Sequence, residues 1–304
     1  MEVLKSLFPI LIIAVLGIVS RKTKIFSREH VKTLSSFVYY FSLPALFYVK
    51  LSTTNIPALD SAIILGSVLP ILLITLVLYL LKIAKRISKE QFILFGLSIS
   101  FGSNAFFGIA LFETLYDGKW LSNAVVAASA FGLVGIPLSL TLFEYATRKG
   151  KGLGFIFKAF RNPLIIAIFL GISSSLLGFH LDALNNALNL IGKTSSGIAI
   201  FALGIFLHDN FSLEAAKKAL TYSLFRMISL PLATWLLLVF IMRGSPDLNQ
   251  FLFLQSGIPA AISLVVFAER YNYKLPEVTG IVILTSVFSF VGLIILSLLS
   301  VIIF

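Results

Sequence analysis

Long apolar segments follow one another along the whole chain, and short stretches of charged or turn-forming residues separate them. A helix that crosses a membrane needs about 20 residues that are mostly apolar, and these segments have roughly that length. The pattern therefore predicts an all-α integral membrane protein. Ten transmembrane helices are expected, near residues 3–20, 33–51, 58–81, 91–115, 121–146, 162–179, 184–207, 219–242, 249–268 and 278–304.

The composition supports this prediction. Of the 304 residues, 58% are hydrophobic and only 12% are charged, whereas a soluble domain is about half apolar and a quarter charged. Ten spans leave only short loops, so no separate soluble domain is expected. The chain has no cysteine and three histidines, which excludes disulfides and thiolate metal sites and argues against a zinc site. We expect no cofactor and no metal.

The positive charge is concentrated in a few loops. The net charge is +11, and most of the 24 Lys and Arg residues fall in the loops after helices 1, 3, 5, 7 and 9. Loops rich in Lys and Arg stay in the cytoplasm, so both termini are expected outside, at the plasma membrane of a prokaryote. The positive charge is explained by its role in orienting the helices in the membrane, so no nucleic-acid partner is expected.

The chain divides near the basic stretch 148–161 into two sets of five helices. Because five is odd, the second set must be inverted in the membrane relative to the first, as in many secondary transporters. Helices 4 and 9 occupy matching places in the two halves. Helix 4 is interrupted by Gly102-Ser103-Asn104 and Gly108, and helix 9 by Ser256-Gly257-Ile258-Pro259.

Paired interruptions indicate a binding site. An unpaired backbone group costs several kcal/mol in hydrocarbon, so a helix breaks only beside protein or a water-filled cavity. Gly relaxes the backbone, while Pro259 removes a donor. A broken helix also presents free N–H groups and a partial positive charge where its second half begins. Two such ends meeting near the midplane are predicted to bind a carboxylate; the alternative is a pair of ordinary kinks.

Several motifs then occur in a specific order. They are Leu43-Pro44-Ala45-Leu46-Phe47 in helix 2, Asn104 and Gly108 in helix 4, Arg161-Asn162-Pro163 at the start of helix 6, Arg226 and Pro231 in helix 8, and Pro259-Ala260-Ala261-Ile262-Ser263 in helix 9. With this order the whole chain resembles the auxin efflux carrier family. Three positions depart from the family pattern: Ala110 stands where a proline is expected, Ala260 where a threonine is expected, and Ser263 where an asparagine is expected.

The resemblance implies a ten-helix fold of two inverted five-helix repeats, with broken helices 4 and 9 crossing at the midplane. It implies a scaffold of helices 1, 2, 6 and 7 (1–52 and 162–209) and a moving transport unit of helices 3–5 and 8–10 (58–146 and 219–304). Family members carry auxins or small carboxylates, and a homodimer in the lipid membrane is expected. The substrate-binding residues are predicted to be Gly102, Ser103, Asn104, Gly108, Pro259, Ala260, Ala261 and Ser263.

Charged residues within the predicted spans are few. No Asp or Glu falls in the central stretch of a span, which argues against an antiporter built on midplane carboxylates. Lys193 lies about nine residues into helix 7, so it is a candidate for a charge role, although a lysine can also snorkel. Arg226 lies nearer the cytoplasmic end of helix 8, where we expect it to snorkel or to anchor the helix.

The sequence therefore predicts a secondary transporter that moves a small organic anion, such as auxin or a carboxylate, by alternating access, in the direction of export. One alternative is a proton- or sodium-coupled transporter of another small solute, and another is a channel. An enzyme is not expected, because the clustered aspartates or Ser–His pairs of intramembrane enzymes are missing from the spans.

Overall fold

The computed structural model describes residues 2–53, 61–147, 163–179, 181–210 and 212–304. These residues are helical throughout, apart from turns and one isolated antiparallel β-bridge. This confirms the all-α fold class. The basic stretch 148–161 and the Arg161-Asn162 start of helix 6 lie outside the described residues.

The chain forms two compact units. Unit 1 contains Met1–Asp60, Ala105–Ser129 and Lys158–Asn210, and unit 2 contains Ser61–Asn104, Ala130–Phe157 and Phe211–Phe304. Helix α7 (Leu121–Thr147) contributes its first part to unit 1 and the rest to unit 2. The predicted assignment of helices to a scaffold and a moving unit stays a prediction.

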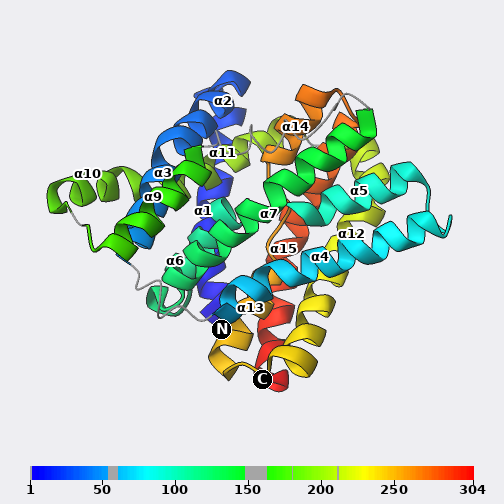
Figure 1. The fold of residues 1–304 in the computed structure, drawn as a ribbon. Coiled ribbons are helices and arrows are strands. Elements are labelled where there is room, and N and C mark those ends of the chain that lie inside the picture. The colour runs from blue at the N-terminus through cyan, green and yellow to red at the C-terminus, as the bar shows by residue number, and fades with distance from the viewer. Residues whose placement is uncertain (1, 54–60, 148–162, 180, 211) are drawn as a thin grey trace. The chain divides into compact units, whose positions relative to one another are not determined.

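Unit 1 is organised by close helix pairs (Figure 1), of which α1 with α11 and α3 with α9 are the most extensive. A π-helical turn at Val38–Ser42 joins α2 and α3 without interrupting the helix. Arg21 donates to the carboxylate of Asp209 at 2.7 Å, which ties the end of α1 to the end of α11. The helices of this unit outside α7 are α1 Glu2–Lys22, α2 Arg28–Phe37, α3 Leu43–Ser52, α6 Ile109–Thr114, α9 Pro163–Leu177, α10 Asp182–Gly192 and α11 Ser195–Asn210.

Unit 2 is built around the long helices α12 and α15, which lie side by side (Figure 1). Gly280 of α15 lets the two backbones approach closely, because a Cβ there would lie 2.6 Å from the carbonyl oxygen of Ala215. The helices of this unit outside α7 are α4 Ser61–Ile83, α5 Lys89–Ser100, α12 Leu213–Leu237, α13 Pro246–Ser256, α14 Ser263–Tyr271 and α15 Leu275–Ile303.

Six helical segments in the described residues are long and apolar enough to cross a membrane: Glu29–Ser52, Ser61–Ile83, Leu121–Thr147, Asp182–Asn210, Leu213–Met242 and Leu275–Ile303. Each corresponds to one of the ten predicted spans. The other four predictions fall on α1, on the 15-residue α9, and on two helices that are broken into shorter pieces. The multi-pass character is confirmed, and the count of ten stays a prediction.

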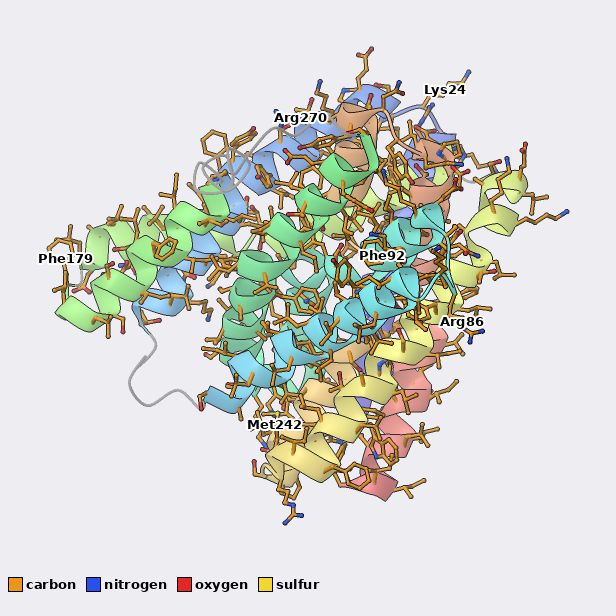
Figure 2. All side chains as sticks on the ribbon, turned by 45° about the vertical axis from the view of Figure 1, so that its right-hand side comes forward. Lys24, Arg86, Phe92, Phe179, Met242 and Arg270 are labelled. Atoms are coloured by element: carbon orange, nitrogen blue, oxygen red, sulfur yellow. The ribbon has the colours of Figure 1, made fainter. Side chains whose placement is uncertain are left out.

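Several helix ends of unit 2 gather on one side. The Nζ atoms of Lys82 in α4 and Lys89 in α5 lie 4.9 and 4.5 Å from the ring centre of Tyr145 in α7. Lys274, before α15, lies 2.9 Å from Glu90 of α5, and this hydrogen bond raises the pKa of Lys274. Figure 2 shows Met242 and Arg270 at opposite ends of this unit. The loops after predicted helices 3 and 9 therefore share one end.

Candidate functional site

The first predicted break lies between α5 and the π-helical turn Asn104–Gly108. Ser88 caps α5, because its Oγ accepts the N–H of Gln91 at 3.1 Å and its own N–H donates to Gln91 Oε1 at 2.9 Å. The helix ends at Ser100, since Phe101 adopts an extended backbone with φ −139°. The chain becomes helical again at Asn104.

The second predicted break lies between α13 and α14. α13 also begins at a serine cap, in which Ser245 Oγ accepts the N–H of Leu248 at 3.4 Å and Pro246 occupies the first helical position. The helix stops at Ser256, and Pro259 cannot donate a backbone hydrogen bond. α14 resumes at Ser263. The structure thus interrupts both helices at the predicted Gly102-Ser103-Asn104 and Ser256–Pro259 segments. The interruption predicted at Gly108 is wrong, because Gly108 has right-handed helical backbone angles and the π-helical turn continues directly into α6.

The two unwound segments pair with each other. Gly102 and Ala260 form the antiparallel bridge. The Ser103 N–H donates to the carbonyl of Pro259 at 2.8 Å, and the Ala261 N–H donates to the carbonyl of Phe101 at 3.0 Å. These bonds satisfy backbone groups that no helix can satisfy here, which is the condition for a break in an apolar environment. We use "the crossing" below for residues 101–104 and 257–262.

A side chain from α15 completes this backbone network. The Ala260 N–H donates to Oγ1 of Thr285 at 3.1 Å, and Thr285 donates in turn to the carbonyl of Ile281 at 2.7 Å. Thr285 is fully buried. The crossing is therefore fixed to α15 as well as to itself.

Arg226 of α12 brings a charge into the crossing. Its side chain is 1% exposed. Nη2 donates to the carbonyls of Ile258 at 2.9 Å and Pro259 at 3.2 Å, Nε donates to Ile258 at 3.3 Å, and Nη1 donates to the carbonyl of Ser98. These carbonyls come from the last turn of α5 and from the second break. Because a helix C-terminus carries partial negative charge, the guanidinium complements the broken ends of both helices.

The expectation that Arg226 snorkels is therefore wrong, whereas its hydrogen bonds do hold α12 to α5 and to the second break. α12 begins at Leu213, six residues before the predicted span, so Arg226 lies deeper in the helix than the sequence boundary implied. Within the described residues, the carboxylates that form ion pairs belong to helix ends, and none pairs with Arg226. Arg226 is a buried cation that backbone carbonyls solvate.

Gly102 leaves the space that the guanidinium occupies. A Cβ on Gly102 would lie 2.8 Å from Nη2 of Arg226, 3.4 Å from Nδ2 of Asn104 and 3.5 Å from the ring of Phe131. Asn104 is 5% exposed, and its Nδ2 has no hydrogen-bond partner. A buried donor without a partner costs about 1–3 kcal/mol. The bare α-carbon of Gly102 is thus flanked by a cation and by an unused amide donor.

A small cavity adjoins the guanidinium. It has a volume of about 20 Å³ and is lined by Arg226 together with Ser67, Thr234, Gln255 and Ser256, among other residues of unit 2. Among these residues, Ser67 Oγ donates a hydrogen bond to Oε1 of Gln255 at 3.2 Å. This volume admits about one water molecule. An organic ligand would therefore require the site to open.

The structure brings together five of the eight predicted binding residues through direct backbone contacts: Gly102, Ser103, Pro259, Ala260 and Ala261. Asn104 lies beside them, and Ser263 is the first residue of α14, where the N–H groups of Leu264 and Val265 already donate to the carbonyls of Ala261 and Ile262. The free amides expected at this helix start are thus partly used.

Two predicted residues belong to unit 1. Gly108 ends the π-helical turn that follows the first break. Lys193 is exposed and follows the last residue of α10, Gly192. Its suggested charge role stays a prediction, and the buried charge observed at the crossing is that of Arg226.

Sequence reasoning missed the ligation by Arg226 and the support from Thr285. One signal was available for Arg226, because an arginine flanked on both sides by apolar helix must be solvated by something. The partner could not be read from the sequence, since backbone carbonyls carry no residue identity. Thr285 gave no signal, because a threonine in an apolar helix most often bonds its own preceding turn.

Comparison with known proteins gives an independent result. Residues 2–297 match the family model described as membrane transport protein. The chain is 27% identical over 281 residues to the uncharacterized transporter YfdV of Escherichia coli K12, with 88% of each chain covered. It is 24% identical to auxin efflux carrier component 8 of Arabidopsis thaliana, over 92% of this chain and 93% of that protein. It is also 24% identical to the lysosomal cholesterol signaling protein of Mus musculus, over 92% of this chain and 36% of that protein.

Proposed function

Because the chain belongs to the membrane transport protein family, the auxin efflux carrier family, we propose that it is a secondary carrier that exports a small organic anion by alternating access. It is a membrane transporter and not an enzyme. The proposal concerns the cargo and the mechanism. We place the substrate at the crossing, against Gly102, Ser103 and Asn104 on one side and Pro259, Ala260, Ala261 and Ser263 on the other, with Gly108 nearby in sequence.

The observation that carries the proposal is the buried, carboxylate-free guanidinium of Arg226 next to the unused amide of Asn104. A cation in a low-dielectric surrounding attracts an anion far more strongly than a cation in water does. The Asn104 amide adds a donor that carries no charge and has no other partner. A carboxylate would accept a hydrogen bond from the amide and balance the charge of the guanidinium, whereas a cationic solute would be repelled by the guanidinium.

The backbone pairing of the two breaks supports a carrier in preference to a channel. The cavity beside Arg226 has a volume of about 20 Å³, and the two breaks seal against each other through backbone hydrogen bonds. A continuous pore would need an open path at this point. A carrier instead needs a site that is closed in some states and opens to one side at a time, which is the expected behaviour of inverted-repeat transporters.

The topology that we propose has ten helices in two inverted five-helix repeats, with both termini outside and a homodimer as the assembly. The shared end of α4, α5, α7 and α15 in unit 2, with its Lys82, Lys89 and Lys274, supports a cytoplasmic location for that end. The serine-capped first halves α5 and α13, of 12 and 11 residues, support the repeat.

Membrane voltage is a sufficient driving force for this mechanism. One elementary charge crossing 100 mV gains about 2.3 kcal/mol, so an inside-negative membrane expels a monovalent anion without a coupled ion. In keeping with this, the described residues place no carboxylate at the crossing. We therefore expect potential-driven export.

Counterflow in proteoliposomes tests the proposal. Purified protein is reconstituted with unlabelled carboxylate inside, and uptake of radiolabelled indole-3-acetate or malate is followed with and without an imposed potential. We expect saturable counterflow of at least one carboxylate and an increase of net flux with potential. Flux without saturation or counterflow would indicate a channel. Strict dependence on a proton or sodium gradient, with no response to potential, would indicate the ion-coupled alternative.

A further inference from the structure

Arg226 occupies a position that resembles a cation site. Its guanidinium contacts three backbone carbonyls, those of Ser98, Ile258 and Pro259, and these come from both interrupted helices. In transporters with broken helices, unwound carbonyls and half-helix C-terminal ends are the groups that coordinate a coupling Na⁺. Here the same class of ligand binds a side chain of the protein itself.

The surroundings of the guanidinium would also suit a free cation. The residues that line the adjoining cavity include Ser67, Thr234 and Ser256, which carry hydroxyl groups, and Gln255, which carries an amide. Neutral oxygen atoms of this kind are the ligands that hard cations prefer. Removing the guanidinium would join its volume to the cavity and leave three carbonyls and several polar side chains around one space.

We propose that Arg226 is a tethered cation that takes the place of a coupling Na⁺ at the crossing. The carbonyls of Ser98, Ile258 and Pro259 then form a latent monovalent-cation site, which becomes available when the guanidinium is removed. In the context of the carrier function proposed above, the tether makes anion transport independent of sodium. The positive charge stays in the site through the whole cycle, so the anion is transported without a cation.

Gly102 is also needed for the guanidinium of Arg226 to reach these carbonyls. Nη2 of Arg226 lies 2.8 Å from the position that a Cβ of Gly102 would take, so a side chain there would shift Nη2 from its present place. The Nη2 bonds to Ile258 and Pro259, at 2.9 and 3.2 Å, hold it in that place. The tether therefore needs both an arginine on α12 and a residue without a side chain in the first break.

Chemical rescue of an Arg226→Ala variant tests the proposal. The melting temperature of purified protein in detergent is measured in choline chloride, while millimolar guanidinium or sodium replaces choline at constant ionic strength. We expect the variant to melt several degrees higher at saturating guanidinium or sodium. Wild-type protein should not respond. The matched control is Arg86→Ala, because Arg86 is an exposed arginine of the same unit (Figure 2) and should behave as wild type.

Two outcomes would overturn the proposal. One is a folded Arg226→Ala variant that melts at the same temperature in choline, sodium and guanidinium. The other is a wild-type protein that sodium stabilises as much as it stabilises the variant, because the site would then not be taken by the side chain.

A wild-type measurement applies even if the variant does not fold. Carboxylate counterflow by wild-type protein should proceed at an unchanged rate when choline replaces all sodium, and a loss of at least tenfold would contradict the tether. Complete absence of counterflow in both media refutes the proposed carrier function instead. The two failures are thus distinguishable.

Discussion

In unit 1, Gly17 of α1 and Gly204 of α11 bring two helix backbones into direct contact, and each added Cβ would lie within 2.2 Å of a carbonyl oxygen of the other helix. In unit 2, Gly102 of the crossing also lacks space for a Cβ, but the nearest atom there is the guanidinium nitrogen Nη2 of Arg226. The first contact packs backbone on backbone and involves no charged side chain. The second makes room for a charge.

The difference shows that a glycine in a membrane helix has two uses. Small residues let membrane helices pack closely, since van der Waals contact is a main source of helix association in lipid. A glycine at a break instead exposes backbone carbonyls to a ligand or a side chain. The neighbours decide which use applies: rigid backbone on both sides at Gly17 and Gly204, and the end of a long side chain at Gly102.

The largest expected effect is on the packing contact of unit 1. Gly204→Ala places a Cβ 2.0 Å from the carbonyl oxygen of Ala14, and neither backbone can yield without separating α1 from α11. Overpacking costs 1–3 kcal/mol or more, so we expect a loss of about 3 kcal/mol and a clearly lower melting temperature in detergent.

The control for this prediction lies in the same helix. Gly197 of α11 has no atom within 4 Å of an added Cβ, so Gly197→Ala should melt at the wild-type temperature or above it. Equal melting temperatures for the Gly204 and Gly197 variants would mean that the close contact does not stabilise unit 1.

The second effect is on the support of the crossing. Thr285→Val keeps the shape of the side chain but leaves the buried Ala260 N–H without its acceptor. An unsatisfied buried donor costs about 1–3 kcal/mol, so we expect a loss of about 2 kcal/mol, measured by thermal unfolding in detergent.

The same substitution elsewhere in α15 provides a comparison. Thr279 is also buried, at 7% exposure, and takes no part in the crossing, so Thr279→Val should cost less than the Thr285 variant. The reverse order would exclude the Ala260–Thr285 bond as a support.

A smaller effect on stability is expected from a substitution within the first break. Gly102→Ala pushes a flexible side-chain end and not a backbone, so we expect a loss of only about 1 kcal/mol. Carboxylate counterflow should fall more than stability does, because Nη2 of Arg226 is displaced. The control is Gly132→Ala in α7 of the same unit, because a Cβ there has no atom within 4 Å. This variant should retain the stability and the counterflow of the wild type. Full counterflow in the Gly102 variant would show that substrate transport does not depend on the position of the guanidinium.

The sequence predicts the breaks better than the groups around them. Pro259 and the Gly102-Ser103-Asn104 segment carry local information, because a missing N–H or a missing side chain weakens a helix wherever it lies. The helical class follows equally well from the apolar segments, because a helix satisfies its own backbone hydrogen bonds within lipid.

The groups around the breaks depend on tertiary contacts. Arg226 reaches carbonyls of Ser98 and Ile258, which are 128 and 32 residues away, and no local pattern encodes such pairs. Its depth also depends on where α12 begins, and Leu213 could not be chosen over a start near 219 from hydropathy alone. The carbonyl ligands are backbone atoms, so residue types do not identify them.

The central claim is that a carboxylate binds at the crossing, and ligand-induced thermal stabilisation tests it most directly. Wild-type protein in detergent is melted with a panel of mono- and dicarboxylates that includes indole-3-acetate, beside Asn104→Ala and the control Asn249→Ala. Asn249 is likewise a buried asparagine of unit 2 with one atom lacking a partner, but it lies near Gly244 at the start of α13. A ligand at 100 times its Kd adds about 2.7 kcal/mol. We predict that one carboxylate stabilises the wild type and the Asn249 variant and not the Asn104 variant. Equal stabilisation of all three proteins, or stabilisation by a neutral solute alone, would contradict the account.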